Sequence, residues 1–206
     1  MKVGPKYKIA RRLGDRIFPK TQGTKFTVSG TDKRIYGKGK KGRRPMSEYG
    51  TQLIEKQKAK YTYGVSEKQL VNYIKATSAK KAEMPTASLY QALERRLDNV
   101  VFRMGLVPSR AFARQACTHG HIMVNGRRVT IPSYQVRADD VISIRPNSKD
   151  NGIFRELSEK IKNHIAPNWL VVDTGKFEAV VKGLPSYKDK EPNLNFEVIM
   201  EFYSRV

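Results

Sequence analysis

The segment that spans residues 88–126 reads SLYQALERRLDNVVFRMGLVPSRAFARQACTHGHIMVNG, and its apolar periodicity decides the fold. In its first part, apolar residues recur at helical spacing, which predicts one helix over residues 88–104. A second, short helix is predicted over residues 109–118, with Ser109 as its N-cap. The apolar period then changes to two, and Asn125-Gly126 is a strong signal for a hairpin turn. Two short helices that lead into a hairpin predict a compact α+β module.

The helix predicted over residues 88–104 carries charge on both sides of its apolar stripe. One flank is basic and the other is acidic: Arg95, Arg96, Asn99 and Arg103 against Glu94 and Asp98. Solvated helices usually mix the two signs of charge. Separate basic and acidic flanks therefore predict two different neighbours.

The helix predicted over residues 109–118 offers a second basic face. Arg110 and Arg114 are four residues apart and share one side, whereas Phe112 and Ala116 point to the core. The end at Ser109 also presents backbone N–H groups that suit a phosphate. We expect this face to bind a polyanion.

The charge of the whole chain supports that expectation. The 206 residues include 40 Lys and Arg against 19 Asp and Glu, a net charge of +21. Residues 1–60 hold 18 basic against 4 acidic residues, whereas residues 151–206 hold 8 of each. Such an excess repels itself unless a polyanion balances it, and an anionic membrane surface is the competing explanation. The gradient predicts that the N-terminal part lies on the polyanion.

The N-terminal segment 1–45 is rich in glycine and basic residues. Glycines and prolines interrupt every element that it could form, and the run from Lys38 to Arg44 alternates charge with glycine. We expect an extension that threads between phosphates and becomes ordered on binding.

Several classes of protein are excluded by composition. Cys117 is the only cysteine, which excludes a disulfide within the chain and a four-cysteine zinc site and fits a reducing compartment. No apolar run approaches the roughly 20 residues of a membrane helix. The N-terminus lacks the apolar stretch of a signal peptide, so we expect a cytoplasmic protein.

The remaining elements are predicted from caps and periodicity. Ser47 is expected to begin a helix that ends at Gly64, and Ser66 to Gln69 match a capping box that begins the second helix of a hairpin. A strand is also expected over 141–144 and a helix over 154–165, and the weakest signals are strands or partly helical segments over 169–172, 177–181 and 196–203.

Blocks of this sequence resemble a known family. Three blocks lie in the segment quoted above: Arg95 to Gly105, Ser109 to Gln115, and His119 to Gly126. Others follow the same order along the chain: Arg11 to Gly14, Ser47 to Gly50, Glu55 to Lys58, Tyr63 to Val65, Pro167 to Leu170, and Glu201 to Arg205. The first three are similar to the αL RNA-binding module. With the others, the chain is identified as a bacterial-type member of the family of small-subunit ribosomal protein four.

The resemblance implies an α+β fold in three parts. These are a basic extension over 1–45, a helical domain over 46–86 packed with 187–206, and an α+β RNA-binding domain over 87–186. Within the last part, the αL module covers about 95–157 and consists of two short helices and an antiparallel sheet.

The resemblance also implies a function. It is that of a structural constituent of the small subunit that binds 16S ribosomal RNA first, nucleates assembly of the subunit body and contributes to translational accuracy. The implied partners are 16S RNA and ribosomal protein five, with a functional link to ribosomal protein twelve. No cofactor, metal, membrane or small-molecule substrate is implied. Members with a zinc site carry cysteines in the extension, and this chain has none there.

The candidate site residues follow from the positions of the basic residues and from the family resemblance. For RNA they are Arg11, Arg12, Lys38, Lys40, Lys41, Arg43, Arg44, Lys56, Lys58, Arg95, Arg96, Arg103, Ser109, Arg110, Arg114, His119, His121, Asn125, Arg127 and Arg128. Glu197 and Glu201 are four residues apart in the neutral C-terminal part and are candidates for a contact with a basic protein.

Four alternatives compete with this interpretation. Arg96-Leu97-Asp98 matches part of a pseudouridine synthase motif, and a stand-alone RNA-modifying or RNA-chaperone protein would use the same module. Cys117, His119 and His121 offer three metal ligands but no fourth nearby. The two short helices also resemble a helix-turn-helix that binds DNA. Membrane binding would need an open apolar helix face, whereas the core uses the apolar faces here.

Overall fold

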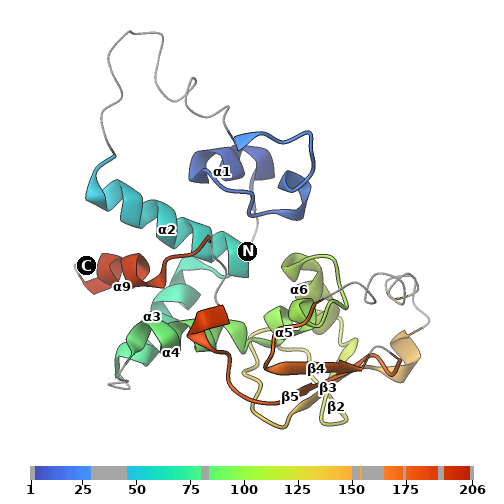
Figure 1. Ribbon diagram of the computed structural model, residues 1–206. Coiled ribbons are helices and arrows are strands. Elements are labelled where there is room, and N and C mark those ends of the chain that lie inside the picture. The colour runs from blue at the N-terminus through green and yellow to red at the C-terminus, as the bar shows by residue number, and fades with distance from the viewer. Residues whose placement is uncertain are drawn as a thin grey trace. The chain divides into compact units, whose positions relative to one another are not determined.

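The computed structural model describes residues 3–28, 46–79, 84–149, 154, 165–173, 175–189 and 193–204. The chain divides into two compact units (Figure 1). We call Met1–Thr86 together with Glu191–Val206 the helical unit, and Ala87–Lys190 the sheet unit. The mixture of helices with an antiparallel sheet confirms the predicted α+β class. The predicted basic run from Lys38 to Arg44 lies outside the described residues.

The start of the helical unit is folded, contrary to expectation. Helix α1 (Lys6–Leu13) is followed by the short 3-10 helix η1 (Pro19–Thr21). Ala10, Phe18 and Phe26 form a small buried core with partly buried apolar neighbours. Gly14 does not prevent the helix but ends it, because its φ of 69° gives the left-handed C-cap that glycine adopts without strain. The prediction that glycines interrupt every element was therefore wrong for this stretch.

The helical hairpin has the predicted caps. Helix α2 (Glu48–Tyr63) begins where the Ser47 side chain accepts a hydrogen bond from Gly50 N–H at 3.2 Å. Gly64 ends α2 in the left-handed conformation. Before α3 (Glu67–Ala79), the Ser66 and Gln69 side chains accept hydrogen bonds from each other's backbone N–H groups, at 3.2 and 3.1 Å. Both helix starts and the capping box are thus confirmed.

The C-terminal segment returns to the helical unit. It is the helix α9 (Phe196–Ser204), which resolves the choice between strand and helix, and it packs along α2 (Figure 1). Phe196, Ile199 and Phe202 recur at helical spacing and are buried.

The helix predicted over 88–104 is in fact two helices, α4 (Pro85–Glu94) and α5 (Leu97–Arg103). The chain becomes extended at Arg96, with φ −66° and ψ 135°, and this residue forms an isolated antiparallel bridge with Gln135. Backbone hydrogen bonds then join Leu97 N–H to Tyr134 C=O and Val136 N–H to Arg95 C=O. Apolar spacing missed the break because the apolar stripe continues through it.

The sheet has five antiparallel strands in the order β2-β1-β3-β5-β4. Their bounds are β1 (Ile122–Val124), β2 (Arg127–Arg128), β3 (Val141–Ile144), β4 (Leu170–Asp173) and β5 (Glu178–Val181). Asn125 and Gly126, with φ of 49° and 75°, make the tight turn between β1 and β2. The hairpin and the strand over 141–144 are therefore confirmed, and the segments near 169–172 and 177–181, for which a strand or a partly helical segment was expected, are strands. Short 3-10 helices η3 (Pro146–Ser148) and η4 (Tyr187–Asp189) also belong to this unit.

One core joins the sheet to α5 and α6 (Arg110–Thr118), which lie over one face of the sheet (Figure 1). Leu97, Val101, Ala113, Ile122 and Ile142 are buried completely in it. The predicted arginines of α6, Arg110 and Arg114, lie on a flank of the helix at the edge of this core, where both are partly exposed. Most of the helix predicted over 154–165 lies outside the described residues.

Candidate nucleic-acid interface

Helix α6 presents the predicted basic face. Ser109 caps it, because its hydroxyl accepts a hydrogen bond from Phe112 N–H at 3.2 Å. Ala113 and Ala116 are buried, whereas 35% of the Arg114 side chain is exposed. We call Arg110 and Arg114 the arginine face.

Arg110 is held on two sides by the sheet unit. Its Nε donates a hydrogen bond to Asn99 Oδ1 at 2.7 Å, and its guanidinium carbon lies 4.5 Å from the centroid of the Phe102 ring. A guanidinium stacked on an aromatic ring and bonded through its edge has little freedom to rotate.

A buried carboxylate organises the helix beside it. Glu94 is completely buried and accepts two hydrogen bonds from Arg103, at 2.9 and 2.8 Å. The Asn99 amide donates to the same carboxylate at 2.8 Å and to the Glu94 carbonyl at 3.0 Å. The predicted separation of basic and acidic flanks was wrong, because the break after α4 turns Glu94 towards Arg103.

A second buried carboxylate, Asp98, binds Arg96 and Arg114. Arg96 Nε and Nη2 lie 3.0 and 2.7 Å from its two oxygens, and Arg114 Nη1 lies at 3.5 Å. The Arg96 side chain is 0% exposed. The expectation that Arg96 reaches an RNA phosphate is therefore corrected: its guanidinium neutralises Asp98 and its backbone makes the break before α5.

Arg95 has a partly structural role as well. Its Nε donates to the Val136 carbonyl at 2.7 Å, and the residue is half-buried. A guanidinium has five N–H donors, so this bond leaves the RNA prediction for Arg95 in place.

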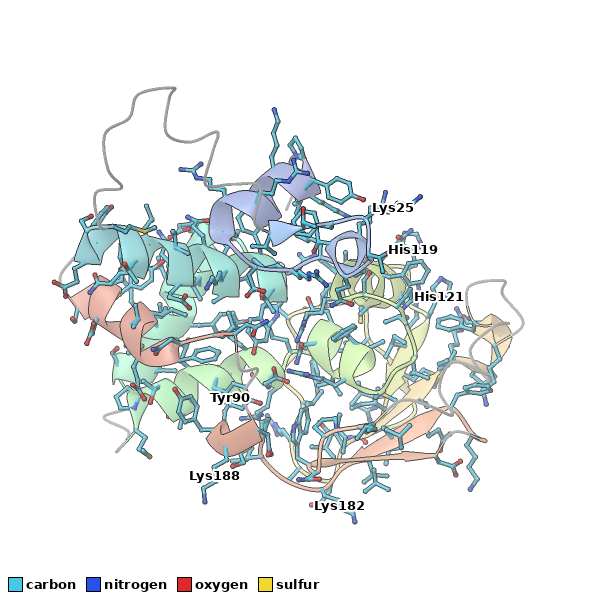
Figure 2. The ribbon with its side chains drawn as sticks, turned by 45° about the horizontal axis from the view of Figure 1, so that its top comes forward. Lys25, Tyr90, His119, His121, Lys182 and Lys188 are labelled. Carbon is cyan, nitrogen blue, oxygen red and sulfur yellow. The ribbon has the colours of Figure 1, made fainter. Side chains whose placement is uncertain are left out.

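A second basic cluster lies after α6, where Figure 2 shows His119 and His121 next to each other. Their ring centroids are 5.9 Å apart, and His121 Nδ1 lies 2.9 Å from Ser148 Oγ. Arg128 donates to the His119 carbonyl at 3.2 Å. Burial lowers the pKa of His121, and the nearby His119, Arg128 and Arg145 lower it further. We call His119, His121, Arg128 and Arg145 the histidine cluster.

Gly120 allows the histidine cluster to form. Its φ is 74°, and an added Cβ would lie almost on top of the Arg128 guanidinium. The absent side chain therefore lets Arg128 cross the backbone between the two histidines. Arg145 was missed in the sequence, although its position directly after a predicted strand would have placed it at that strand's end.

Two other candidate residues lie in the hairpin, and their side chains differ in their contacts. Arg127 is exposed on β2. Asn125 instead uses both ends of its amide internally, because it donates to Asp140 Oδ1 and accepts from Val141 N–H, each at 2.8 Å. Its side chain fixes the turn, and because the residue is exposed, its contact with RNA stays a prediction.

Lys56 and Lys58 are paired inside the helical unit. Lys56 is 8% exposed, donates to Glu67 at 2.7 Å and lies 4.6 Å from the centroid of the Phe202 ring. Lys58 donates to Glu55 at 2.7 Å, with 18% of its side chain exposed. The prediction that Lys56 binds RNA is corrected, because its ammonium joins α2 to α3 and α9. Lys58 stays a weaker candidate.

The other candidates of the helical unit lie at its surface. On α1, Arg12 is exposed, whereas Arg11 is half-buried and its guanidinium lies 5.8 Å from the Phe26 ring. On α9, Glu197 and Glu201 are exposed on one side of the helix, and Glu201 accepts a hydrogen bond from Gln52 at 3.3 Å.

Neither a metal site nor a membrane span is found in the part of the chain that the structure describes. No three of its His, Cys, Asp and Glu residues cluster as metal ligands would. Its helices are all too short or too polar to cross a bilayer. Cys117 is completely buried, and burial, with the charge of Asp98, raises the pKa of its thiol to about 12.

Comparisons with known proteins agree with this geometry. Residues 2–94 match the model of the ribosomal protein S4/S9 N-terminal domain, and residues 95–142 match the S4 domain. The chain is 44% identical to the small ribosomal subunit protein uS4 of Roseiflexus castenholzii and 41% identical to that of Chloroflexus aurantiacus. It is 42% identical to that of Shewanella loihica, and each alignment covers 98% of both chains. The chain therefore belongs to the uS4 family of small ribosomal subunit proteins.

Proposed function

We propose that this chain is a structural constituent of the small ribosomal subunit and binds 16S ribosomal RNA through the sheet unit. The observation that carries the proposal is the arginine face: Arg110 and Arg114 lie side by side on a partly exposed flank of a short, capped helix whose inner side is buried. The S4 domain match covers the same helix. The names of the relatives place those proteins in the small ribosomal subunit.

The mechanism is electrostatic and geometric. Arginine guanidinium groups form two-pronged hydrogen bonds with phosphate oxygens, and the N-terminal N–H groups of α6 add donors. The histidine cluster and Arg127 extend the basic surface beyond the end of α6. Contacts to the RNA backbone select a folded shape rather than a base sequence. A rigid protein surface that fits several RNA helices offsets the free-energy cost of arranging them, which is the physical basis for nucleating assembly.

The proposal has a second part, which concerns protein contacts and decoding. The side of α9 with Glu197 and Glu201 is acidic and exposed. A surface of this charge suits a basic protein rather than RNA, and the family resemblance points to ribosomal protein five. Through that contact, and in functional connection with ribosomal protein twelve, the chain contributes to translational accuracy.

Binding and footprinting on protein-free 16S RNA test the proposal. We expect a defined protected region and an affinity that falls steeply with salt, with a log–log slope of about −0.7 to −0.9 for each phosphate contacted. Duplex DNA of equal charge serves as competitor at the same salt concentration. Equal affinity for DNA and RNA, or protection spread evenly along the RNA, would contradict the proposal.

A further inference from the structure

Behind the arginine face lies a set of polar side chains that does not reach the surface. Two buried carboxylates and one buried amide make the set, since Glu94, Asp98 and Asn99 are at most 3% exposed. Each of them bonds to an arginine of α5 or α6. Buried charges are costly, so their presence beside a basic surface needs a physical reason.

We propose that Asn99, supported by Glu94, is a positioning residue for RNA binding: it holds the Arg110 guanidinium in the orientation that meets a phosphate before the RNA arrives. The inference rests on the proposed function of the arginine face. It assigns the role to a residue that does not itself touch the RNA.

The chemistry of Asn99 suits this task. Its NH₂ group donates to the Glu94 carboxylate and carbonyl, and this leaves its oxygen pointing to Arg110 Nε, 2.7 Å away. The reverse orientation would set an NH₂ group against a guanidinium and an oxygen against a carboxylate. Glu94 therefore fixes the amide, and the amide fixes the arginine.

An amide suits this position better than a carboxylate. A third acid here would stand 2.8 Å from Glu94 and would reduce the positive charge that attracts phosphate. Among the described residues, four arginines, Arg96, Arg103, Arg110 and Arg114, bond to this set, which holds two acids, so these side chains together carry more positive than negative charge.

Positioning matters because arginine has many rotamers. A free side chain loses this freedom when it binds, and that loss weakens the complex. The bond to Asn99 and the Phe102 ring, at 4.5 Å, hold Arg110 before binding. The effect of Asn99 on affinity should therefore depend on the presence of Arg110.

A double-mutant cycle on the full chain tests this dependence, with protein-free 16S RNA as the ligand. We expect Arg110→Ala and Asn99→Ala each to weaken binding about 5- to 15-fold. The double variant should bind no more than about two-fold more weakly than Arg110→Ala alone, because Asn99 acts through Arg110.

Gln135→Ala is the matched control. Gln135 is a half-buried amide of the same unit that donates to the Ala92 carbonyl at 3.1 Å and to no arginine. Its loss should lower thermal stability without changing the affinity of the folded protein. Thermal unfolding of all four variants separates lost stability from lost affinity.

The outcomes separate the two proposals. The positioning role is overturned if Arg110→Ala weakens binding but Asn99→Ala does not. It is also overturned if the double variant loses affinity by the product of the two single losses. In both cases the arginine face remains the RNA-binding surface. If Arg110→Ala leaves affinity unchanged, both fail.

Wild-type protein provides a test that does not depend on a variant folding. We expect the Arg110 Nε–H to be rigid in NMR relaxation of the RNA-free protein, with an order parameter near that of the backbone. A freely moving Nε–H in the free protein would overturn the inference.

Discussion

The two units contain ion pairs of opposite arrangement. In the helical unit the cation is buried: the Lys56 side chain is 9% exposed, whereas its partner Glu67 is 41% exposed. In the sheet unit the acid is buried: Glu94 is 0% exposed beside Arg103 at 20%, and Asp98 is 5% exposed beside Arg114 at 35%. The exposed member of a pair is the one that a ligand meets. A count of charges along the chain does not reveal this difference.

The arrangement in the helical unit serves the fold. Lys56 and Lys60 of α2 bind Glu67 of α3, and Tyr203 of α9 donates to the same carboxylate at 2.7 Å. Burial and this hydrogen bond to Glu67 raise the pKa of Tyr203. One carboxylate thus joins three helices, whereas in the sheet unit two buried carboxylates bind the partly exposed Arg103 and Arg114.

The largest expected effect is on RNA affinity. Changing Arg110 and Arg114 together to Glu should weaken binding to 16S RNA by several kcal/mol, because each lost phosphate contact and each new repulsion is of order 1–2 kcal/mol. Filter binding measures the affinity, and circular dichroism checks that the variant is folded. A folded variant with wild-type affinity would show that the arginine face is not the interface.

A substitution in the helical unit should affect stability instead. Lys56→Met removes an ion pair and the contact with the Phe202 ring, and it should lower the free energy of unfolding by about 1–2 kcal/mol. The affinity of the folded protein for RNA should stay within about two-fold. Lys68→Met, on the exposed side of α3, is the control and should change neither quantity. A specific loss of RNA affinity in Lys56→Met would erase the contrast between the units.

The pH dependence of the free energy of unfolding should report the ionisation of Glu67. Burial raises its pKa, but hydrogen bonds from Lys56, Tyr203 and Lys60 outweigh burial and lower the pKa from 4.5 to about 2. Stabilisation from a lowered pKa is present above pH 4.5 and is lost as the pH falls towards 2. Because Glu67 is well exposed, we expect a loss of only about 1 kcal/mol. Urea unfolding should show a steeper loss of stability between pH 4.5 and 2 in the wild type than in Glu67→Gln, because all other acidic residues are common to both proteins.

The smallest effect concerns α1. Arg12 is exposed, so Arg12→Gln should weaken RNA binding by about two- to three-fold and reduce the log–log salt slope by about one phosphate contact. Lys8→Gln, at another exposed position of the same helix, provides a comparison for the affinity and the salt slope. Equal slopes in wild type and Arg12→Gln would remove α1 from the interface.

Much of the local structure could be predicted because its signals are local. Ser47, Ser66 and Ser109 all cap helices as expected, and Asn125-Gly126 makes the expected hairpin. The family was also recognised correctly from short blocks, and membership of the uS4 family confirms a structural protein rather than an enzyme.

Most of the errors share one physical cause, which is that long-range partners are not visible in sequence. The break at Arg96 depends on a bridge to Gln135, which is 39 positions away. Lys56 looked exposed because its aromatic neighbours Phe202 and Tyr203 come from the far end of the chain. The contacts of Asn99 with Glu94 and Arg110 could not be read from spacing, because they follow from the break between α4 and α5.

Directed cleavage of RNA from two positions on the protein tests the central claim most directly. A tethered iron chelate is attached to Thr118→Cys, on the exposed side of α6, or to Glu197→Cys, on α9. Cys117 needs no replacement because it is completely buried and its thiol pKa is raised to about 12. The wild-type chain is the control for labelling. We predict strong, localised cleavage of protein-free 16S RNA from position 118 and little from position 197. Strong cleavage from position 197 with none from position 118 would contradict the account, because RNA would then lie on the acidic side of α9 and away from the arginine face.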